Sequence, residues 1–259
     1  MRIILLTDFS PHAASAAGVA IKLAKLERKD VEIVHIEEEQ EHGASTERLL
    51  KQLKDTFFQK GIVAHCHTLE CSIENIPEQI KLTTDDLIIM GTHGHKGWKE
   101  KWIGTFTQKL LRTSPAPILA VPLHLNQWTL EEILFVSDFD DLSLDSTLLK
   151  RIHSTFKSFS PEIHLLKIFS PDDDSVNQKT DGIESLQLPY RTFHKVRLEH
   201  FKTIEQAIFE QADTIDADII ALKTHARSGW FHSLLGSTAE SVLIQAKVPV
   251  WIQRVTHEG

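Results

Sequence analysis

The sequence predicts an α/β protein made of two tandem domains, each with a five-stranded parallel sheet flanked by helices. Two observations lead to this fold class. Short apolar runs alternate with segments of helical period, which is typical of βαβ units. The 259 residues also repeat themselves after about half the chain. A composition of 41% hydrophobic and 25% charged residues is that of a globular protein, and the length is sufficient for two domains.

The internal repeat is visible at the start, middle and end of each copy. Residues 3–9 (IILLTDF) return as residues 133–139 (ILFVSDF), and residues 87–98 (LIIMGTHGHKGW) return as residues 219–230 (IIALKTHARSGW). A short apolar run after a proline closes both copies. We therefore expect one domain at 1–125 and a second at 130–259, with the junction near 124–129.

The first elements of the first copy are a buried strand at 2–7 and a helix that follows it. Ser10 is suited to the N-cap and Pro11 to the first helical position. The apolar residues after them fall on one helical face, namely Ala16, Val19, Ala20 and Leu23. A second strand is expected at 31–36.

The rest of the first copy continues the alternation of helix and strand. A second helix carries Leu49, Leu50, Leu53 and Phe57 on one side and ends at Gly61, where a glycine can adopt the left-handed conformation. We then expect a strand at 62–69, a helix at 78–82, a strand at 87–90, a helix opening at Gly104-Thr105 and a strand at 118–121. In the second copy, residues 171–182 form a turn-rich acidic stretch, so the corresponding helix should be late or shortened there.

Charge, cysteine content and hydropathy restrict the functional classes. A formal net charge of -8 and a pI near 6.0 give no electrostatic footprint for DNA or RNA. The two cysteines, Cys66 and Cys71, are expected to be free thiols in a reducing compartment. No apolar stretch approaches the roughly 20 residues of a membrane span, so we expect a cytoplasmic protein.

The candidate site lies at the carboxyl ends of the first and fourth strands. With the strand order 3-2-1-4-5, these strands are neighbours, and Asp8 and the loop from Gly91 to Gly94 flank one crevice. The two glycines have no side chain to keep backbone amides from an anion, and Gly104-Thr105 adds amides and a hydroxyl at a helix N-terminus. A polyphosphate is the ligand that this chemistry favours.

These residues resemble the universal stress proteins, and in particular the tandem two-domain members. The family motif Gly-x2-Gly-x9-Gly-(Ser/Thr) is met by Gly91, Gly94, Gly104 and Thr105, and the Thr-Asp pair that ends the first strand is Thr7-Asp8. The resemblance implies a Rossmann-like fold and ATP binding, with Asp8 near the ribose, the backbone of Ile36 near the adenine and Mg²⁺ held by the phosphates. The expected nucleotide-binding residues are Thr7, Asp8, Ile36, Met90, Gly91, Gly94, Gly104, Thr105, Phe106 and Thr107.

The second copy departs from this motif in the loop after its fourth strand. Lys223 and Ala226 replace the two loop glycines, while Gly236-Ser237 and Asp138 remain. The Lys223 side chain should occupy the space that the phosphates need, although a cation there could hold a smaller anion. We therefore expect one nucleotide site, in the first copy, and a degenerate motif in the second.

Several of these residues also have plainer structural interpretations. Asp8 recurs as Asp138 in the degenerate copy, which favours a turn or capping carboxylate, and Thr105 could be a first-turn hydroxyl. We interpret the recurring pairs His93/His225 and Trp98/Trp230 as loop supports and packing anchors. His65, Cys66 and His67 match no zinc signature and suit the edge strand of the sheet.

Three functions remain open. The first is an ATP-binding regulatory protein of the stress response, with at most slow ATP hydrolysis. The second is a slow ATPase or nucleotidyl-transfer enzyme, because a fold does not decide function. The third is a scaffold whose second domain binds another ligand or a protein partner. We also expect an internal pseudo-dimer in which the fifth strands, around Ile118 and Val250, lie near the two-fold axis, and a further homodimer stays open.

Overall fold

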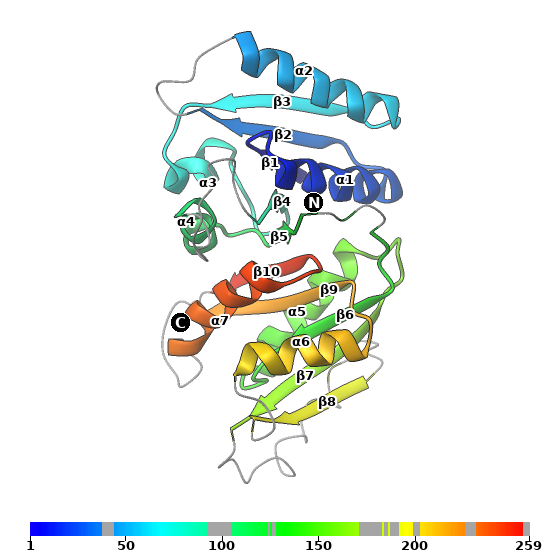
Figure 1. Cartoon of the computed structure of the whole chain (residues 1–259), viewed down its shortest axis with the longest axis vertical. Coiled ribbons are helices and arrows are strands. Elements are labelled where there is room, and N and C mark those ends of the chain that lie inside the picture. The colour runs from blue at the N-terminus through cyan, green and yellow to red at the C-terminus, as the bar shows by residue number, and fades with distance from the viewer. Residues whose placement is uncertain are drawn as a thin grey trace.

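The computed structural model contains one ten-stranded sheet with the order β3-β2-β1-β4-β5-β10-β9-β6-β7-β8 (Figure 1). It describes residues 1–37, 44–92, 105–123, 125, 128–170, 183, 186, 192–198, 203–225 and 232–255. We call strands β1 to β5 with their helices the first half, and strands β6 to β10 with their helices the second half. Each half has the strand order 3-2-1-4-5 with parallel neighbours, as the sequence predicts.

The elements of the first half are β1 (Ile3–Thr7), α1 (Pro11–Glu27), β2 (Val31–Ile36), α2 (Ala44–Gln59), β3 (Ala64–Leu69), the 3-10 helix η1 (Ile73–Asn75), α3 (Ile76–Gln79), β4 (Leu87–Gly91), α4 (Thr105–Thr113) and β5 (Ile118–Val121). Those of the second half are β6 (Glu132–Val136), α5 (Leu142–Thr155), β7 (Glu162–Phe169), β8 (Thr192–Arg197), α6 (Ile204–Thr214), β9 (Ile219–His225), α7 (His232–Gln245) and β10 (Val250–Val255).

The helix boundaries follow local chemistry that the sequence displays. The Ser10 side chain accepts a hydrogen bond from the Ala13 N–H, and Pro11 occupies the first turn of α1, as predicted. The chain leaves α2 through Gly61, whose φ of +78° is a conformation that glycine adopts at little cost. The start of α1 and the end of α2 therefore lie at the residues that the sequence predicts for them.

The prediction of a helix at 78–82 is wrong in its position. A 3-10 turn at Ile73–Asn75 leads into α3 at Ile76–Gln79, and Lys81 already has a left-handed φ of 49°. Pro77 explains the difference, because proline is tolerated in the first turn of a helix and so fixes its start here. The third strand begins at Ala64, two residues later than expected. The acidic stretch at 171–182 and its late helix lie outside the described residues.

The two halves join through their fifth strands. β5 and β10 are antiparallel, with Ala120 opposite Val250 and Leu119 opposite Trp251. The expected meeting of the fifth strands near Ile118 and Val250 is therefore confirmed. The pairing joins the two five-stranded units into one continuous sheet whose outer strands are β3 and β8.

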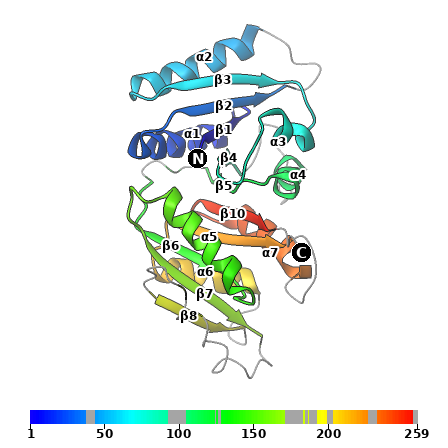
Figure 2. The ribbon, with the colours of Figure 1, turned by 180° about the vertical axis from the view of Figure 1, so that it is seen from behind.

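Helices cover both faces of the sheet (Figures 1 and 2). Along β1, Ile3 and Leu5 belong to a core under α1, α2 and α5, while Ile4 and Leu6 face a second core under α3 and α4. A third core lies under α6 and α7. This alternation is the two-residue period of a strand that is buried on both faces. No helix in the described part of the chain is long and apolar enough to cross a membrane.

Candidate functional site

The predicted crevice of the first half lies where β1 and β4 end. The two strands pair side by side, with Ile3 opposite Leu87, so Thr7 and Asp8 leave the sheet at the same edge as Met90 and Gly91. Their meeting at one edge is what the strand order predicts.

The other predicted residues divide between described and undescribed parts of the chain. Ile36 is the last residue of β2, and β2 flanks β1 on the side away from β4. Thr105 and Phe106 begin α4, and Thr107 in its first turn is buried. Gly94 and Gly104 lie outside the described residues, as does His93.

A tight turn follows β1 and orients Asp8. Asp8 Oδ1 accepts the N–H of Ser10 at 3.0 Å, Thr7 Oγ1 accepts the N–H of Phe9 at 3.1 Å, and Phe9 has a left-handed φ of 60°. The buried ring of His35 donates from Nδ1 to the Thr7 carbonyl at 2.8 Å. Asp8 therefore has the turn role that its recurrence suggested, and this role fixes its place at the carboxyl end of β1, where the crevice is predicted.

Gly91 is needed for packing, independently of any ligand. A Cβ at this position would lie 2.7 Å from the carbonyl carbon of His12 and 2.7 Å from the His12 Cβ, which is closer than real Cβ contacts. The first turn of α1 therefore lies directly against the end of β4. Gly91 therefore has a packing role in addition to the phosphate access that the motif predicts.

The same turn follows β6 in the second half. The Phe139 N–H donates to Ser137 Oγ at 2.9 Å, the Asp140 N–H donates to Asp138 Oδ1 at 3.3 Å, and Phe139 has a φ of 54°. The repeat is thus structural at this point as well as sequential, and the two crevices can be compared residue by residue.

Lys223 makes the two crevices different. It stands at the position on β9 that Gly91 has on β4, since β9 pairs with β6 in the register in which β4 pairs with β1. Its side chain is buried, with Nζ 2.7 Å from Asp138 Oδ1 and 3.0 Å from Asp145 Oδ1. Ser137 Oγ donates to the same Asp145 oxygen at 2.8 Å. The second crevice therefore contains its own internal cation and two carboxylates.

Burial and charge act against each other in this cluster. Burial raises the pKa of Asp145, and the neighbouring Asp138 adds to this, although the Lys223 ammonium opposes both. Burial alone would lower the pKa of Lys223, but Asp145 and Asp138 outweigh it and raise the pKa. Asp145 Oδ2 is buried without a hydrogen-bond partner among the described residues. Lys223 is therefore held in its charged form, while only one of the two carboxylate oxygens of Asp145 accepts hydrogen bonds from the described residues.

Sequence reasoning found Lys223 but missed Asp145. A signal was present, because Asp145 precedes Leu148, Leu149 and Ile152 at the spacing of the buried face of α5. An acidic residue on an apolar helical face predicts a buried cationic partner, which the topology supplies from β9.

Comparisons with known proteins agree with this architecture. The sequence profile of the Universal stress protein family matches residues 1–122 and 191–254. The structure resembles that of a universal stress protein from Archaeoglobus fulgidus DSM 4304, at a TM-score of 0.74 and 17% identity over 98% of each chain.

A second solved structure gives the same result. It is a putative universal stress protein from Pseudomonas aeruginosa UCBPP-PA14, at a TM-score of 0.67 and 18% identity over 98% of this chain and 92% of that one. No curated protein matches the sequence significantly. The structural likeness establishes the fold, and the family profile covers more than half of the chain. The chain therefore belongs to the universal stress protein family.

Proposed function

We propose that this protein is an ATP-binding regulatory protein of the stress response and that its first half holds the nucleotide. The observation that supports this most directly is the contrast between Gly91 and Lys223. These residues occupy the same position in the two halves: Lys223 places a buried ammonium next to Asp138 and Asp145, whereas Gly91 adds no side chain and lies against the start of α1. The complete Gly-x2-Gly-x9-Gly-Thr motif stands in the half without that side chain.

The residues at the mouth of the first crevice have the chemistry that a nucleotide requires. A carboxylate can accept several hydrogen bonds, so Asp8 can accept from a ribose hydroxyl while Oδ1 holds the Ser10 N–H. The N-terminus of α4, which begins at Thr105, offers backbone amides and a favourable dipole to phosphate oxygens. Ile36, at the end of β2, would present its backbone to the base.

A bound Mg²⁺ would neutralise part of the triphosphate charge. Mg²⁺ keeps several of its waters and binds readily through substrate phosphates, so the phosphates can hold it without a set of protein carboxylates. In this proposal Thr105 and Thr107 hydrogen-bond phosphate oxygens, and Met90 and Gly91 form the floor beneath them.

Lys223 supports a stoichiometry of one nucleotide per chain. To admit a triphosphate in the second half, the Lys223 ammonium would have to leave Asp138 and Asp145, which would leave two carboxylates next to an anion. This cost favours the partner or scaffold role for the second half, as the sequence analysis left open.

The experiment is a calorimetric titration of the full chain with Mg-ATP, repeated with Gly94→Val. We expect one site in the wild type and loss of most of the affinity in the variant, because the new side chain would block the approach of phosphate to the loop amides. The matched control is Ala226→Val, the corresponding change in the second half, which should leave ATP binding unchanged. Gly91 is unsuitable for this test because its substitution would disturb the packing on His12.

Two results would contradict the proposal. One is equal loss of ATP affinity in Gly94→Val and Ala226→Val, which would make the two halves equivalent. The other is wild-type ATP affinity in Gly94→Val, with both proteins shown by circular dichroism to be folded.

A further inference from the structure

We propose that the second half carries a site for a zinc-type divalent cation, formed by Glu132, Glu162 and His164. The site lies at the amino ends of β6 and β7, at the edge of the sheet opposite the crevices. It is independent of nucleotide binding, and either proposal can fail without the other.

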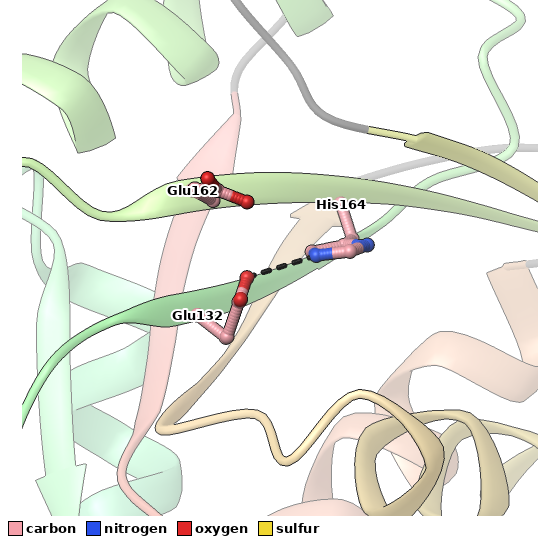
Figure 3. Close-up of side chains that lie close together, drawn as sticks. All are labelled: Glu132, Glu162 and His164. Carbon is pink, nitrogen blue, oxygen red and sulfur yellow. Dashed lines mark hydrogen bonds and ion pairs between the residues drawn. The ribbon is translucent and has the colours of Figure 1, made fainter.

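The register of β6 and β7 brings these three side chains together. Glu132 lies opposite Glu162, and His164 follows two residues later on the same face of β7. One ligand atom from each residue lies within 4.8 Å of the others, and His164 Nε2 is 2.9 Å from Glu132 Oε2 (Figure 3). The picture shows the Glu132 carboxylate and the His164 ring facing each other, with Glu162 beside them.

The chemistry of this group suits Zn²⁺ better than Mg²⁺ or Ca²⁺. Zn²⁺ accepts imidazole nitrogen together with carboxylate oxygen, whereas the harder cations prefer oxygen throughout. With metal–ligand bonds of about 2.0 to 2.1 Å, the ligand atoms of a tetrahedral zinc site lie about 3.3 Å apart. On binding, the 2.9 Å distance between Glu132 Oε2 and His164 Nε2 would therefore lengthen slightly, and the carboxylate of Glu162 would move towards them. Glu162 is exposed and can make that movement. A water molecule would complete the coordination.

The second ring nitrogen of His164 already has a hydrogen-bond partner, as it does in most metal-binding histidines. His164 is only 6% exposed, and its second nitrogen, Nδ1, lies 3.0 Å from His194 Nε2. His194 Nδ1 in turn lies 3.3 Å from the amide nitrogen of Gln211 on α6. Such outer partners orient the ring and fix its tautomer.

The hydrogen-bonded series of His164, His194 and Gln211 can adopt tautomers that are compatible with metal binding. With Zn²⁺ on His164 Nε2, the His164 proton would sit on Nδ1 and be donated to His194 Nε2. His194 would then donate from Nδ1 to Gln211, whose amide would turn to present its oxygen.

The first half shows a cation at the same place. By strand register, Glu132 corresponds to Arg2, Glu162 to Asp30 and His164 to Glu32. The Arg2 guanidinium lies 3.4 Å from Glu32 and 2.7 Å from Asp86.

In the second half, Glu132 stands at the position of Arg2, so a carboxylate lies where the first half has a guanidinium cation. Asp218, the counterpart of Asp86, accepts the Glu132 N–H at 3.0 Å and so adds a further negative charge at this strand end. A bound divalent ion would restore the positive charge that the first half obtains from Arg2.

The experiment is a calorimetric titration of the chelator-treated full chain with Zn²⁺, followed by anomalous diffraction at the zinc edge. We expect an anomalous peak between Glu132, Glu162 and His164, and at least about tenfold weaker binding at that site in Glu162→Gln. The matched control is Asp30→Asn, which changes the corresponding exposed carboxylate of the first half and should leave the affinity unchanged.

Other histidines can bind zinc weakly, so the position of the peak is decisive. An anomalous peak elsewhere, with none at these three residues, would overturn the proposal. Wild-type zinc affinity in both Glu162→Gln and Glu132→Gln would also overturn it. Because Glu162 is exposed, its variant should fold even if substitution of Glu132 disturbs the strand, and thermal denaturation without zinc checks this.

Discussion

The Lys223 ammonium lies 2.7 Å from the Asp138 carboxylate, at the strand position where the first half has Gly91 packed against the start of α1. The same position of the repeated strand therefore carries a buried ion pair in the second half and a close backbone contact in the first half. Asp145 on α5 supplies the second carboxylate next to the Lys223 ammonium. A buried ion pair of this kind is destabilising when only one partner is removed.

Lys223→Met should destabilise the second half by about 3 to 5 kcal/mol, because the variant leaves Asp138 and Asp145 without their buried counter-ion. Urea unfolding followed by circular dichroism measures the change. The double variant Lys223→Met/Asp145→Leu should recover much of the loss, since an apolar pair can replace a buried ion pair. Lys150→Met, at an exposed position of α5, is the control and should change stability by no more than about 0.5 kcal/mol.

An unchanged urea midpoint in Lys223→Met would show that the ion pairs contribute little to the fold. Moving the Lys223 ammonium away from Asp138 and Asp145 would then cost little, and a second nucleotide in that half would no longer be disfavoured.

Gly91→Ala should destabilise the first half by about 1 to 3 kcal/mol, because the new Cβ would meet the His12 backbone at 2.7 Å. The contrasting variant is Gly18→Ala in the middle of α1, where a Cβ has nothing within 4 Å. That change should stabilise the protein by about 0.5 to 1 kcal/mol, the usual difference between alanine and glycine in a helix. Thermal or urea unfolding of both variants provides the comparison, and an equal effect of the two changes would contradict the packing argument.

The sequence predicts the fold well because each element carries a local signal. The alternating cores on either side of β1, the Ser10-Pro11 start of α1 and the turn at Gly61 all depend on neighbouring residues. The position of α3 failed because the constraint of Pro77 was overlooked. The strand order 3-2-1-4-5 came with the α/β fold class and not with any local signal, and both halves have it.

The candidate sites were predicted less completely because their contacts span long stretches of chain. Gly91 meets His12, and Lys223 meets Asp145, only after the helices have packed on the sheet. The grouping of Glu132 with His164 depends on the register of β6 and β7, which an apolar pattern does not fix to the residue. Residue types can therefore indicate individual residues of these sites, but tertiary packing decides which of those residues lie in contact.

Bound ATP should turn over far more slowly than about 10 per second, the median for enzymes. Among the described residues, Asp8 is proposed to bind the ribose rather than the terminal phosphate, and His35 is only 7% exposed beneath the Thr7 carbonyl, so neither side chain is offered to an attacking water. Phosphate release under single-turnover conditions measures the rate. A rate near the enzyme median that is lost in His93→Ala, with ATP affinity unchanged, would place the protein among the ATP-hydrolysing enzymes.

Stability of the first half should fall as the pH drops from about 4 to 2, because of Asp86. Burial would raise the pKa of this carboxyl, but hydrogen bonds from Arg2 and Thr83 outweigh burial and lower it from 3.8 to about 2. Since the folded pKa is the lower one, the stabilisation is complete above the unfolded pKa and is lost on acidification through the folded pKa; it amounts to about 2 kcal/mol.

Asp86→Asn should remove this stabilisation at neutral pH and flatten the dependence of the urea midpoint on pH between 4 and 2. Asp55→Asn, on the exposed face of α2, should leave that dependence unchanged, and an Asp86→Asn curve parallel to that of the wild type would contradict the assignment.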